Sequence, residues 1–397
     1  MCHDKIKGEN TMAIKVGIIG IGNQGGYYAQ NMSHSKHLEL AAVADIDPAR
    51  LEWAEKELPQ VARFDDAIAM LDSGLIEACL VVTPHYDHPR YAMECMKRGI
   101  HVLVDKPVGV YTKQVKELNA MADANPHIQF GVMFCLRTIE VYQKLHELMQ
   151  SGEYGEMRRM SWIITTWYRS QAYYDSGSWR ATWAGEGGAV LMNQCPHQLD
   201  LLQWICGLPV KVHSHLHFGK WHDIETEDDV TAYLEFANGA TGIFVTSTGD
   251  ARGTNRLEIQ MDRGRFIVEN DVLTIETYDM PEPEFSKTNT QPFAGLGYKS
   301  EEFHGKTPDM FHFLVLDAWA ESIMGTGESI ADGREGLNST ELTNAMQLSS
   351  FLGREVTVPI DDELYYTELM KRVETSKKKE NVKTVIADTS NSFSGAK

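Results

Sequence analysis

The segment Gly20-Ile-Gly22-Asn-Gln-Gly25 decides the fold of this chain. It follows an apolar run over residues 13–19 and precedes a stretch over residues 27–32 that is compatible with a helix. In such a strand–turn–helix unit, the first glycine permits a tight turn, the second lets the main chain approach a pyrophosphate, and the third lets the helix pack on the strand. The helix N-terminus then faces the phosphates. The segment therefore predicts a dinucleotide site, whose expected cofactor contacts are Gly20, Gly22, Asn23, Gln24 and Gly25.

One acidic residue indicates which dinucleotide binds. Asp45 follows the apolar run over residues 40–44, which is the pattern of the next buried strand. A carboxylate there accepts hydrogen bonds from the ribose hydroxyls and repels a 2′-phosphate, so Asp45 favours NAD over NADP. The alternative is an ordinary strand-to-helix turn in which Asp45 caps the segment that starts at Pro48.

Residues 13–136 alternate short apolar runs with helical patterns. This alternation predicts an α/β domain of the Rossmann type, with a doubly wound parallel sheet. Its expected strands are residues 14–19, 40–44, 78–82, 102–104 and 129–133, and its expected helices are residues 49–58, 89–98 and 112–125.

Residues 137–370 predict a C-terminal α+β domain with a large, open, mostly antiparallel sheet, because β-branched and aromatic residues dominate its short runs. After a helix at residues 138–151, the expected strands are residues 157–167, 210–218, 229–236, 241–249, 256–261 and 264–269. Asn238-Gly239 predicts a hairpin between two of them. Further predictions are an irregular loop over a site or at a subunit contact (280–304), helices (309–323 and 334–352) and a polar C-terminal tail (371–397).

Length and charge exclude several classes of function. The 397 residues, 43% of them hydrophobic, suffice for two domain cores. A formal net charge of -19 repels nucleic acid and anionic membranes. No run approaches the roughly 18 apolar residues that a membrane span needs, and residues 1–12 lack the apolar core of a secretory signal. We therefore expect a cytoplasmic protein, in which residues 1–11 are either native or an extension upstream of Met12.

The six cysteines form no CxxC pair, which predicts reduced thiols. Cys195 lies two residues before His197, so a nucleophilic thiol is an alternative. No pattern of activating residues accompanies it.

Lys106 is the first candidate for chemistry. The strand that ends at Val104 is followed by Asp105-Lys106-Pro107, at the carboxyl edge of the sheet, where ligands of such folds bind. Burial and a neighbouring oxidised nicotinamide lower the pKa of an ammonium, so Lys106 suits proton transfer at an alcohol oxygen. The alternative is a solvated loop lysine.

His197 is the second candidate. It lies in the segment GGAVLMNQCPHQLD over residues 187–200, which begins with a flexible turn and runs into a predicted helix. His197 and Asp200 share a helix face, and Asn193 lies one turn earlier on that face if the helix extends so far. His197 can accept a hydroxyl proton and Asn193 can orient it or the substrate. Alone the histidine would be read as a core residue, but Lys106 upstream favours catalysis.

Together these motifs resemble the Gfo/Idh/MocA oxidoreductase family over most of residues 13–370. The resemblance implies an N-terminal Rossmann domain, a C-terminal domain for substrate and subunit contacts, and chemistry on sugars and cyclitols. The family's Glu-Lys-Pro motif stands here as Asp105-Lys106-Pro107, with the same charge and a shorter reach. Where the family commonly has an aspartate four residues before the catalytic histidine, this chain has Asn193. An amide cannot share a proton with Lys106 or stabilise its charge as a carboxylate would. Proton transfer is therefore assigned to His197 and Lys106, and Asn193 has a positioning role.

The resemblance also implies the position of other residues. It places Thr83, Pro84, His85, Asp105 and Trp183 near the cofactor, and Arg180 near cofactor or substrate. Aromatic residues are dense before Gly187, and flat rings pack on the C–H faces of a pyranose. Any single ring is more simply explained as core, but collectively they predict a carbohydrate site. Its expected residues are Lys106, Tyr173, Trp179, Arg180, Asn193 and His197.

The sequence therefore predicts an NAD-dependent oxidoreductase that oxidises a secondary hydroxyl of a sugar or glycoside. The run from Asn193 to His197 is similar to that of family members that oxidise glycosides at C3 to 3-keto sugars. An inositol dehydrogenase or a sugar reductase of the same family is the alternative. We also expect a homo-oligomer, a dimer or a tetramer, because an open sheet with an apolar outer face needs covering.

Two other classes of function are weaker. A sensor that binds dinucleotide without turnover would not need both Lys106 and His197. A metal site of His85, Asp87 and His88 would follow Thr83-Pro84 at a strand end, and no second ligand cluster is evident, so no metal is expected.

Overall fold

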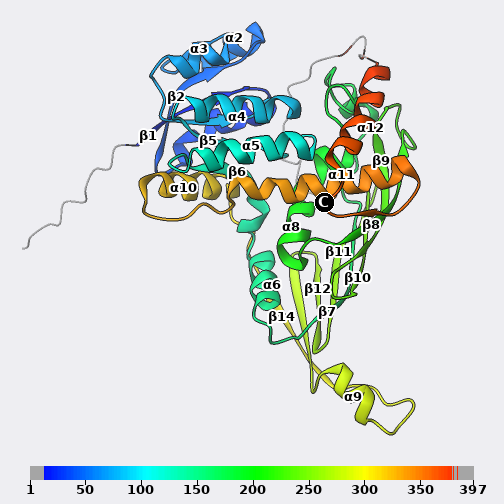
Figure 1. Ribbon diagram of the computed structural model, residues 1–397. Helices are drawn as coiled ribbons and strands as arrows, with labels where there is room; N and C mark the ends of the chain where they lie inside the picture. The colour runs from blue at the N-terminus through cyan, green and yellow to red at the C-terminus, as the bar shows by residue number, and fades with distance from the viewer. Residues whose placement is uncertain (1–12, 378, 380–381, 383–397) are drawn as a thin grey trace, which may run out of the picture.

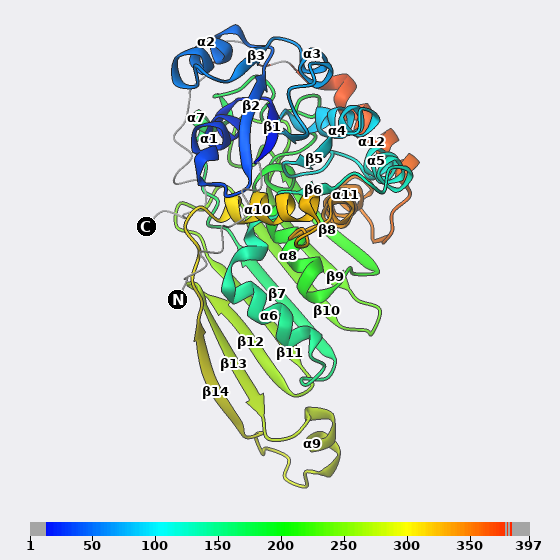
Figure 2. The ribbon, with the colours of Figure 1, turned by 90° about the vertical axis from the view of Figure 1, so that its left-hand side faces the viewer.

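Two sheets organise the chain (Figure 1). The computed structural model describes residues 13–377, 379 and 382, so residues 1–11 and most of the expected tail lie outside the described residues. Helices cover both faces of the first sheet, whereas α6 and α8 lie on one face of the second (Figure 2). Within the described ranges, no helix has the length and apolar character to cross a bilayer.

The first sheet has six parallel strands in the order β3-β2-β1-β4-β5-β6. The strands are β1 (Ile14–Ile19), β2 (Leu38–Ala44), β3 (Ala62–Phe64), β4 (Ala78–Val81), β5 (His101–Val104) and β6 (Phe130–Val132). The crossover helices are α1 (Asn23–Asn31), α2 (Pro48–Glu57), α3 (Ala67–Asp72), α4 (His88–Lys97) and α5 (Thr112–Ala124). The strand order reverses between β1 and β4, where ligands of such sheets bind. The predicted doubly wound sheet is confirmed.

The second sheet has nine strands in the order β14-β13-β12-β11-β7-β10-β9-β8-β15. They are β7 (Met157–Ile164), β8 (Lys211–Phe218), β9 (Glu227–Glu235), β10 (Thr241–Ser247), β11 (Asn255–Met261), β12 (Gly264–Glu269), β13 (Val272–Tyr278), β14 (Tyr298–His304) and β15 (Val356–Thr357). β7 and β10 pair in parallel and the other neighbours antiparallel, which confirms a mostly antiparallel sheet. Asn238-Gly239 turns between β9 and β10 as predicted, with Gly239 at a φ of 85°.

The core of the second sheet is formed with α6 (Glu140–Gln150), α8 (Pro196–Cys206), α11 (Gly336–Leu352) and α12 (Asp362–Thr375). Leu145, Leu199 and Met346 come from three of these helices and are fully buried there. α12 continues through Thr375, so the first residues of the expected tail are helical.

Residues 280–304 differ from the expected loop. They form α9 (Glu282–Thr288) and β14, which pairs with β13 along its whole length. Pro281 and Pro283 stand at the start of α9, where a missing N–H breaks no helical hydrogen bond. The expectation of an irregular loop is therefore wrong, and within this chain α9 lies at the end of the second sheet that is remote from the first sheet (Figure 1). A subunit contact of this segment stays a prediction.

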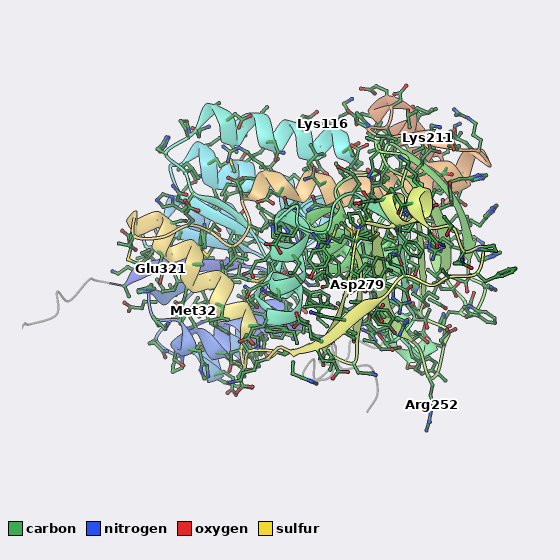
Figure 3. All side chains as sticks on the ribbon, turned by 90° about the horizontal axis from the view of Figure 1, so that it is seen from below. Met32, Lys116, Lys211, Arg252, Asp279 and Glu321 are labelled. Atoms are coloured by element: carbon green, nitrogen blue, oxygen red, sulfur yellow. The ribbon has the colours of Figure 1, made fainter. Side chains whose placement is uncertain are left out.

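The helix α10 (Phe311–Met324) comes late in the chain but packs on the first sheet. Its Trp319 is fully buried, and the indole Nε1 donates a hydrogen bond to the Gln129 carbonyl at 3.2 Å. Asp317 accepts a hydrogen bond from the Ser35 hydroxyl at 2.6 Å. Figure 3 shows Glu321 of α10 on the same side of the molecule as Met32, which follows α1. The core of the first sheet therefore depends on residues from both halves of the chain.

We expect Trp319→Ala to lower the free energy of unfolding by about 3–5 kcal/mol, because it leaves a large cavity between α10 and the first sheet. Leu314→Ala is the matched control, since Leu314 lies on the same helix and is 39% exposed. Urea unfolding of both variants measures the difference. Equal, small effects would contradict the packing of α10 described above.

Candidate active site

The predicted glycine turn joins β1 to α1, and two of its glycines are required by packing. Gly20 has a φ of 87°, and a Cβ there would lie 2.7 Å from the Val82 carbonyl oxygen. A Cβ on Gly25 would lie 1.9 Å from the Gly20 carbonyl oxygen. A Cβ on Gly22 would meet nothing within 4 Å, so the space over Gly22 is open.

Asp45 lies beside this turn at the end of β2. Its Oδ2 accepts a hydrogen bond from the Ile21 amide at 2.8 Å, and its Oδ1 accepts one from the Asp47 amide at 2.9 Å. Asp47, not Asp45, caps α2, which contradicts the alternative reading of Asp45. The carboxylate is thus held at the glycine turn.

Two buried polar atoms near the turn favour a bound polar ligand. Asn23 Oδ1 and Thr83 Oγ1 have no hydrogen-bond partner among the described residues. Gln24 is half-buried in the first turn of α1, and Pro84 is exposed next to Thr83. These oxygens and the open space over Gly22 fit the phosphates and sugars of a dinucleotide.

Lys106 links the end of β5 to the segment that precedes α8. It follows β5, the Lys106–Pro107 peptide bond is cis, and its Nζ donates a hydrogen bond to the Asn193 main-chain carbonyl at 2.8 Å. Burial lowers the pKa of Lys106, which the Asp105 carboxylate opposes. Burial in turn raises the pKa of Asp105, whose Oδ1 accepts a hydrogen bond from the Tyr28 hydroxyl at 3.4 Å.

Two buried histidines hold the turn after β4 through contacts with backbone carbonyl oxygens. The ring nitrogens of His88 lie 2.7 Å from the Pro107 carbonyl oxygen and 2.6 Å from that of Thr83. His85 Nδ1 lies 3.4 Å from the Glu186 carbonyl oxygen. Backbone carbonyl oxygens thus lie next to both ring nitrogens of His88 and next to one of His85. In the described part of the chain, no three His, Cys, Asp or Glu residues are grouped as a metal site requires.

His197 lies on α8, as predicted, and is 2% exposed. Its Nε2 is 3.9 Å from Cys135 Sγ. Burial, and then the charge of Lys106, hold the pKa of His197 well below its ordinary value, so the ring is neutral at pH 7. His312 on α10 is a second neutral imidazole near Lys106, since burial lowers its pKa to about 4.

Asp200 shares α8 with His197 but binds another residue. Arg137 donates to both of its carboxylate oxygens, from Nε at 2.8 Å and from Nη2 at 2.6 Å. Arg137 is 2% exposed at its side chain and also binds Glu335 at 2.8 Å. Because Arg137 follows β6, this ion pair fixes α8 against the first sheet, and nothing in the sequence indicated it.

Asn193 does not lie on α8, contrary to the conditional prediction. A π-helical turn, Val190–Gln194, precedes the helix. The helical conformation is interrupted at Cys195, and α8 begins at Pro196. The Asn193 side-chain amide donates a short hydrogen bond to Glu186 Oε1.

A buried carboxylate holds this π-helical turn. Glu227 Oε1 accepts hydrogen bonds from the Ala189 amide at 2.9 Å and the Leu191 amide at 3.2 Å. The turn therefore depends on a residue from β9, which a local pattern could not reveal.

The predicted substrate residues form one cluster beside Asn193. The Arg180 guanidinium lies 4.7 Å from the Tyr173 ring centroid and 4.6 Å from that of Trp179, and it donates to the Tyr173 hydroxyl at 2.9 Å. Gln194, which the sequence reasoning missed, donates to the same hydroxyl at 2.9 Å, and its buried Oε1 has no hydrogen-bond partner among the described residues.

Trp183 lies apart from this cluster. Its ring is 6% exposed and packs on Phe218 and Phe351, so its visible role is packing. Its carbonyl accepts a hydrogen bond from the Tyr86 hydroxyl at 2.8 Å, next to His85. A cofactor contact of Trp183 stays a prediction.

Cys195 is a poor nucleophile here. It is fully buried, and burial raises the pKa of its thiol to about 12, so the thiolate is scarce at pH 7. Its Sγ lies 3.1 Å from the Thr246 hydroxyl. The described cysteines Cys79, Cys95, Cys135, Cys195 and Cys206 are all free thiols, as predicted.

Comparison with known proteins agrees with this geometry. Residues 14–134 match the oxidoreductase family with an NAD-binding Rossmann fold, and residues 142–267 match the GFO/IDH/MocA C-terminal domain. The chain belongs to the Gfo/Idh/MocA family. This confirms the predicted family and the oxidoreductase class.

Individual relatives cover different shares of the chain. Over 57% of this chain and 56% of the relative, it is 28% identical to the 1-carboxy-3-chloro-3,4-dihydroxycyclohexa-1,5-diene dehydrogenase of Comamonas testosteroni. An uncharacterized Bacillus subtilis oxidoreductase, YrbE, is 24% identical over 88% of this chain and 97% of its own length. The WlbA dehydrogenase of Chromobacterium violaceum, solved with NADH and UDP-GlcNAcA, is 27% identical with a TM-score of 0.75, covering 89% of this chain and 98% of that one.

We expect Gly22→Ala to leave the melting temperature unchanged and to weaken NADH binding about tenfold or more, which is about 1.4 kcal/mol of binding free energy. The added methyl group meets no protein atom but fills the space left for the pyrophosphate. Gly25→Ala is the control and should lower the melting temperature instead. NADH fluorescence titration and thermal melting test both, and undiminished NADH binding by Gly22→Ala would contradict the assignment.

Glu227 predicts a pH dependence of stability. Burial raises its pKa from 4.5 to about 7, so the folded state holds an extra proton between these values and wild-type stability falls as the pH rises through them. Glu227→Gln keeps the acceptor for the π-helical turn without titrating. Relative to wild type, this variant should gain on the order of 2–3 kcal/mol in unfolding free energy between pH 4.5 and pH 8. Urea unfolding across this range measures it, and parallel curves would contradict it.

Proposed function

We propose that this chain is an NAD-dependent dehydrogenase that oxidises a secondary hydroxyl of a sugar or glycoside. The observation that carries the proposal is the meeting of Lys106 and a neutral His197 beside the glycine turn, with each residue supplied by a different part of the chain. A neutral imidazole and an amine of lowered pKa are groups that can take a hydroxyl proton. In this proposal, residues 13–136 bind the dinucleotide and residues 137–370 bind the substrate and other subunits.

The proposed cofactor contacts come from four segments, which follow β1, β2, β4 and β5. Gly20 to Gly25 would hold the pyrophosphate, Asp45 the adenosine ribose, and the turn from Thr83 to His85 with Asp105 the nicotinamide side. When bound, the dinucleotide supplies a hydride acceptor at nicotinamide C4. Asp45 favours NAD, and the NADH bound by the WlbA dehydrogenase supports this choice.

Lys106 and His197 have different roles in proton transfer. His197 is buried and uncharged, so it can accept the hydroxyl proton without first losing one. Lys106 is held by the Asn193 carbonyl. Its amine can donate a hydrogen bond to the substrate oxygen, and the proton of that hydrogen bond can move between the amine and the oxygen. Asn193 positions the amine through its main chain.

The substrate class follows from the cluster of Tyr173, Trp179, Arg180 and Gln194. Flat rings would pack on the C–H face of a sugar, while Arg180 and the unpaired Gln194 Oε1 would bind hydroxyls. The ring diol in the name of the Comamonas relative and the nucleotide sugar bound by the WlbA dehydrogenase support a polyhydroxylated ring. Oxidation at C3 is part of the proposal, and an inositol is the alternative substrate.

We further propose that the outer face of the second sheet binds another copy of this chain. Ile163, Tyr233 and Ile243 are 42%, 43% and 44% exposed on neighbouring strands, and Tyr233 is paired with Ile243. An exposed apolar patch of this kind needs a cover. A dimer or tetramer in sedimentation would support it. The cytoplasmic location stays a prediction from the sequence.

Absorbance of reduced nicotinamide tests the proposed function. The purified protein is mixed with NAD or NADP and with a panel of glucosides, free sugars, inositols and sugar acids. A rise with NAD and one class of sugar is expected and identifies the substrate. No rise with any compound, although NADH binding is confirmed, would favour either a tightly held cofactor that is recycled by a second substrate or a dinucleotide sensor.

We expect Lys106→Ala and His197→Ala each to lower kcat by about 100-fold or more while NADH affinity stays near that of wild type, because proton transfer typically contributes that much. Lys113→Ala on α5 is the control, since its amine binds Glu363 at the surface. Stopped-flow kinetics and NADH titration measure both quantities. Wild-type rates in either variant would eliminate that residue from the mechanism.

A further inference from the structure

Glu186 is a buried carboxylate inside the site that the mechanism above does not use. It is 2% exposed. Its Oε2 accepts a hydrogen bond from the Ala181 amide at 2.5 Å, and its Oε1 accepts the short hydrogen bond from the Asn193 side-chain amide. A charge in so buried a place is costly unless it is paired, so its retention at the site calls for a reason.

Glu186 is linked to Lys106 through a single residue. Asn193 receives a hydrogen bond from Lys106 Nζ at its main-chain carbonyl and donates one to Glu186 from its side chain. The two charged groups also act on each other directly, since the Glu186 carboxylate favours the ammonium form of Lys106. Burial raises the pKa of Glu186, and the charges of Arg180 and then Lys106 oppose that rise and favour the carboxylate.

We propose that Glu186 is a positioning residue that supplies the negative charge which Asn193 lacks, and that it fixes both the amide of Asn193 and the proton affinity of Lys106. The inference rests on the proposed function, because it assigns Lys106 to proton transfer. With Nδ2 bound to Glu186, Asn193 Oδ1 must point the other way, toward Gln194 Nε2 at 3.4 Å. The amide therefore presents one defined face to a substrate.

Other titratable groups around Lys106 also affect its proton affinity. Asp105 is the second carboxylate beside Lys106, and it adjoins Lys106 in the chain. The thiols nearby are buried and protonated, and the imidazoles nearby are neutral, so neither kind balances the ammonium. The titratable neighbours of Lys106 are Asp105, Cys135, Glu186, Cys195, His85, His197 and His312.

Moving the carboxylate from position 186 to position 193, its hydrogen-bond partner, tests the proposal. Glu186→Gln removes the charge, Asn193→Asp adds one, and the double variant exchanges the acid and the amide while a carboxylate and an amide still face each other. Glu225→Gln is the control. Glu225 is also a glutamate held by a hydrogen bond, but its partner is the Ser376 hydroxyl at 2.7 Å and not Asn193. Thermal melting identifies any variant that fails to fold.

The first readout does not need a substrate. Competitive labelling of the full chain with acetic anhydride, read for the Lys106 peptide by mass spectrometry, gives the pH at which the amine becomes reactive. We expect this midpoint to fall in Glu186→Gln, to rise in Asn193→Asp and to return toward wild type in the double variant. Unchanged midpoints in both single variants would overturn the proposal even if the enzyme turns over sugars.

The second readout uses the substrate found with the panel. We expect Glu186→Gln to lower kcat/KM about tenfold or more and to move its pH profile to lower pH, with the double variant recovering most of the loss. A merely structural role would lower activity without moving the profile, and would not be rescued by Asn193→Asp. If no sugar is oxidised, the labelling midpoints still decide whether Glu186 governs Lys106.

Discussion

The ion pair between Arg137 and Asp200 is the interaction on which the site depends. Both partners are almost completely buried, and the guanidinium binds both carboxylate oxygens, so neither charge can be left alone without a large desolvation cost. Arg137 extends from the end of the first sheet, and Asp200 lies one helical turn after His197. The pair therefore sets the distance between the imidazole and Lys106, whose own hydrogen bond to Asn193 crosses the same boundary.

Burial keeps the imidazoles around Lys106 uncharged. His85, His197 and His312 surround Lys106, and burial lowers the pKa of each. Charging any of these rings would add a second positive charge inside the protein, so they remain bases at neutral pH. The charge of Lys106 instead faces the Asn193 carbonyl and the carboxylates of Asp105 and Glu186, and Arg180 is a second cation near Glu186. Several groups at the site can therefore accept a proton at neutral pH.

Much of the fold and of the site could be predicted because the signals are local. The glycine spacing, Asp45 at a strand end and the run from Asp105 to Pro107 each depend on the residues next to them. The position of Asn193 could not be predicted from the sequence, because its π-helical turn is held by Glu227 from a distant strand. Glu186 and Arg137 are single charged residues without a pattern, and they acquire meaning only from their partners in the fold. The strand β14 was missed because its neighbouring prolines and glycines resemble a loop.

The position of α10 bears on how this architecture can be divided. Residues 13–136 contain every strand of the first sheet, yet one wall of its core is a helix from residues 311–324. A gene fragment that ends after β6 would encode a sheet with an uncovered apolar surface around the Trp319 site. The dinucleotide-binding half is consequently not an interchangeable module that could be fused to another catalytic domain. Any shortened form that keeps the first sheet intact must therefore also keep α10, whereas α9 lies far from that core (Figure 1).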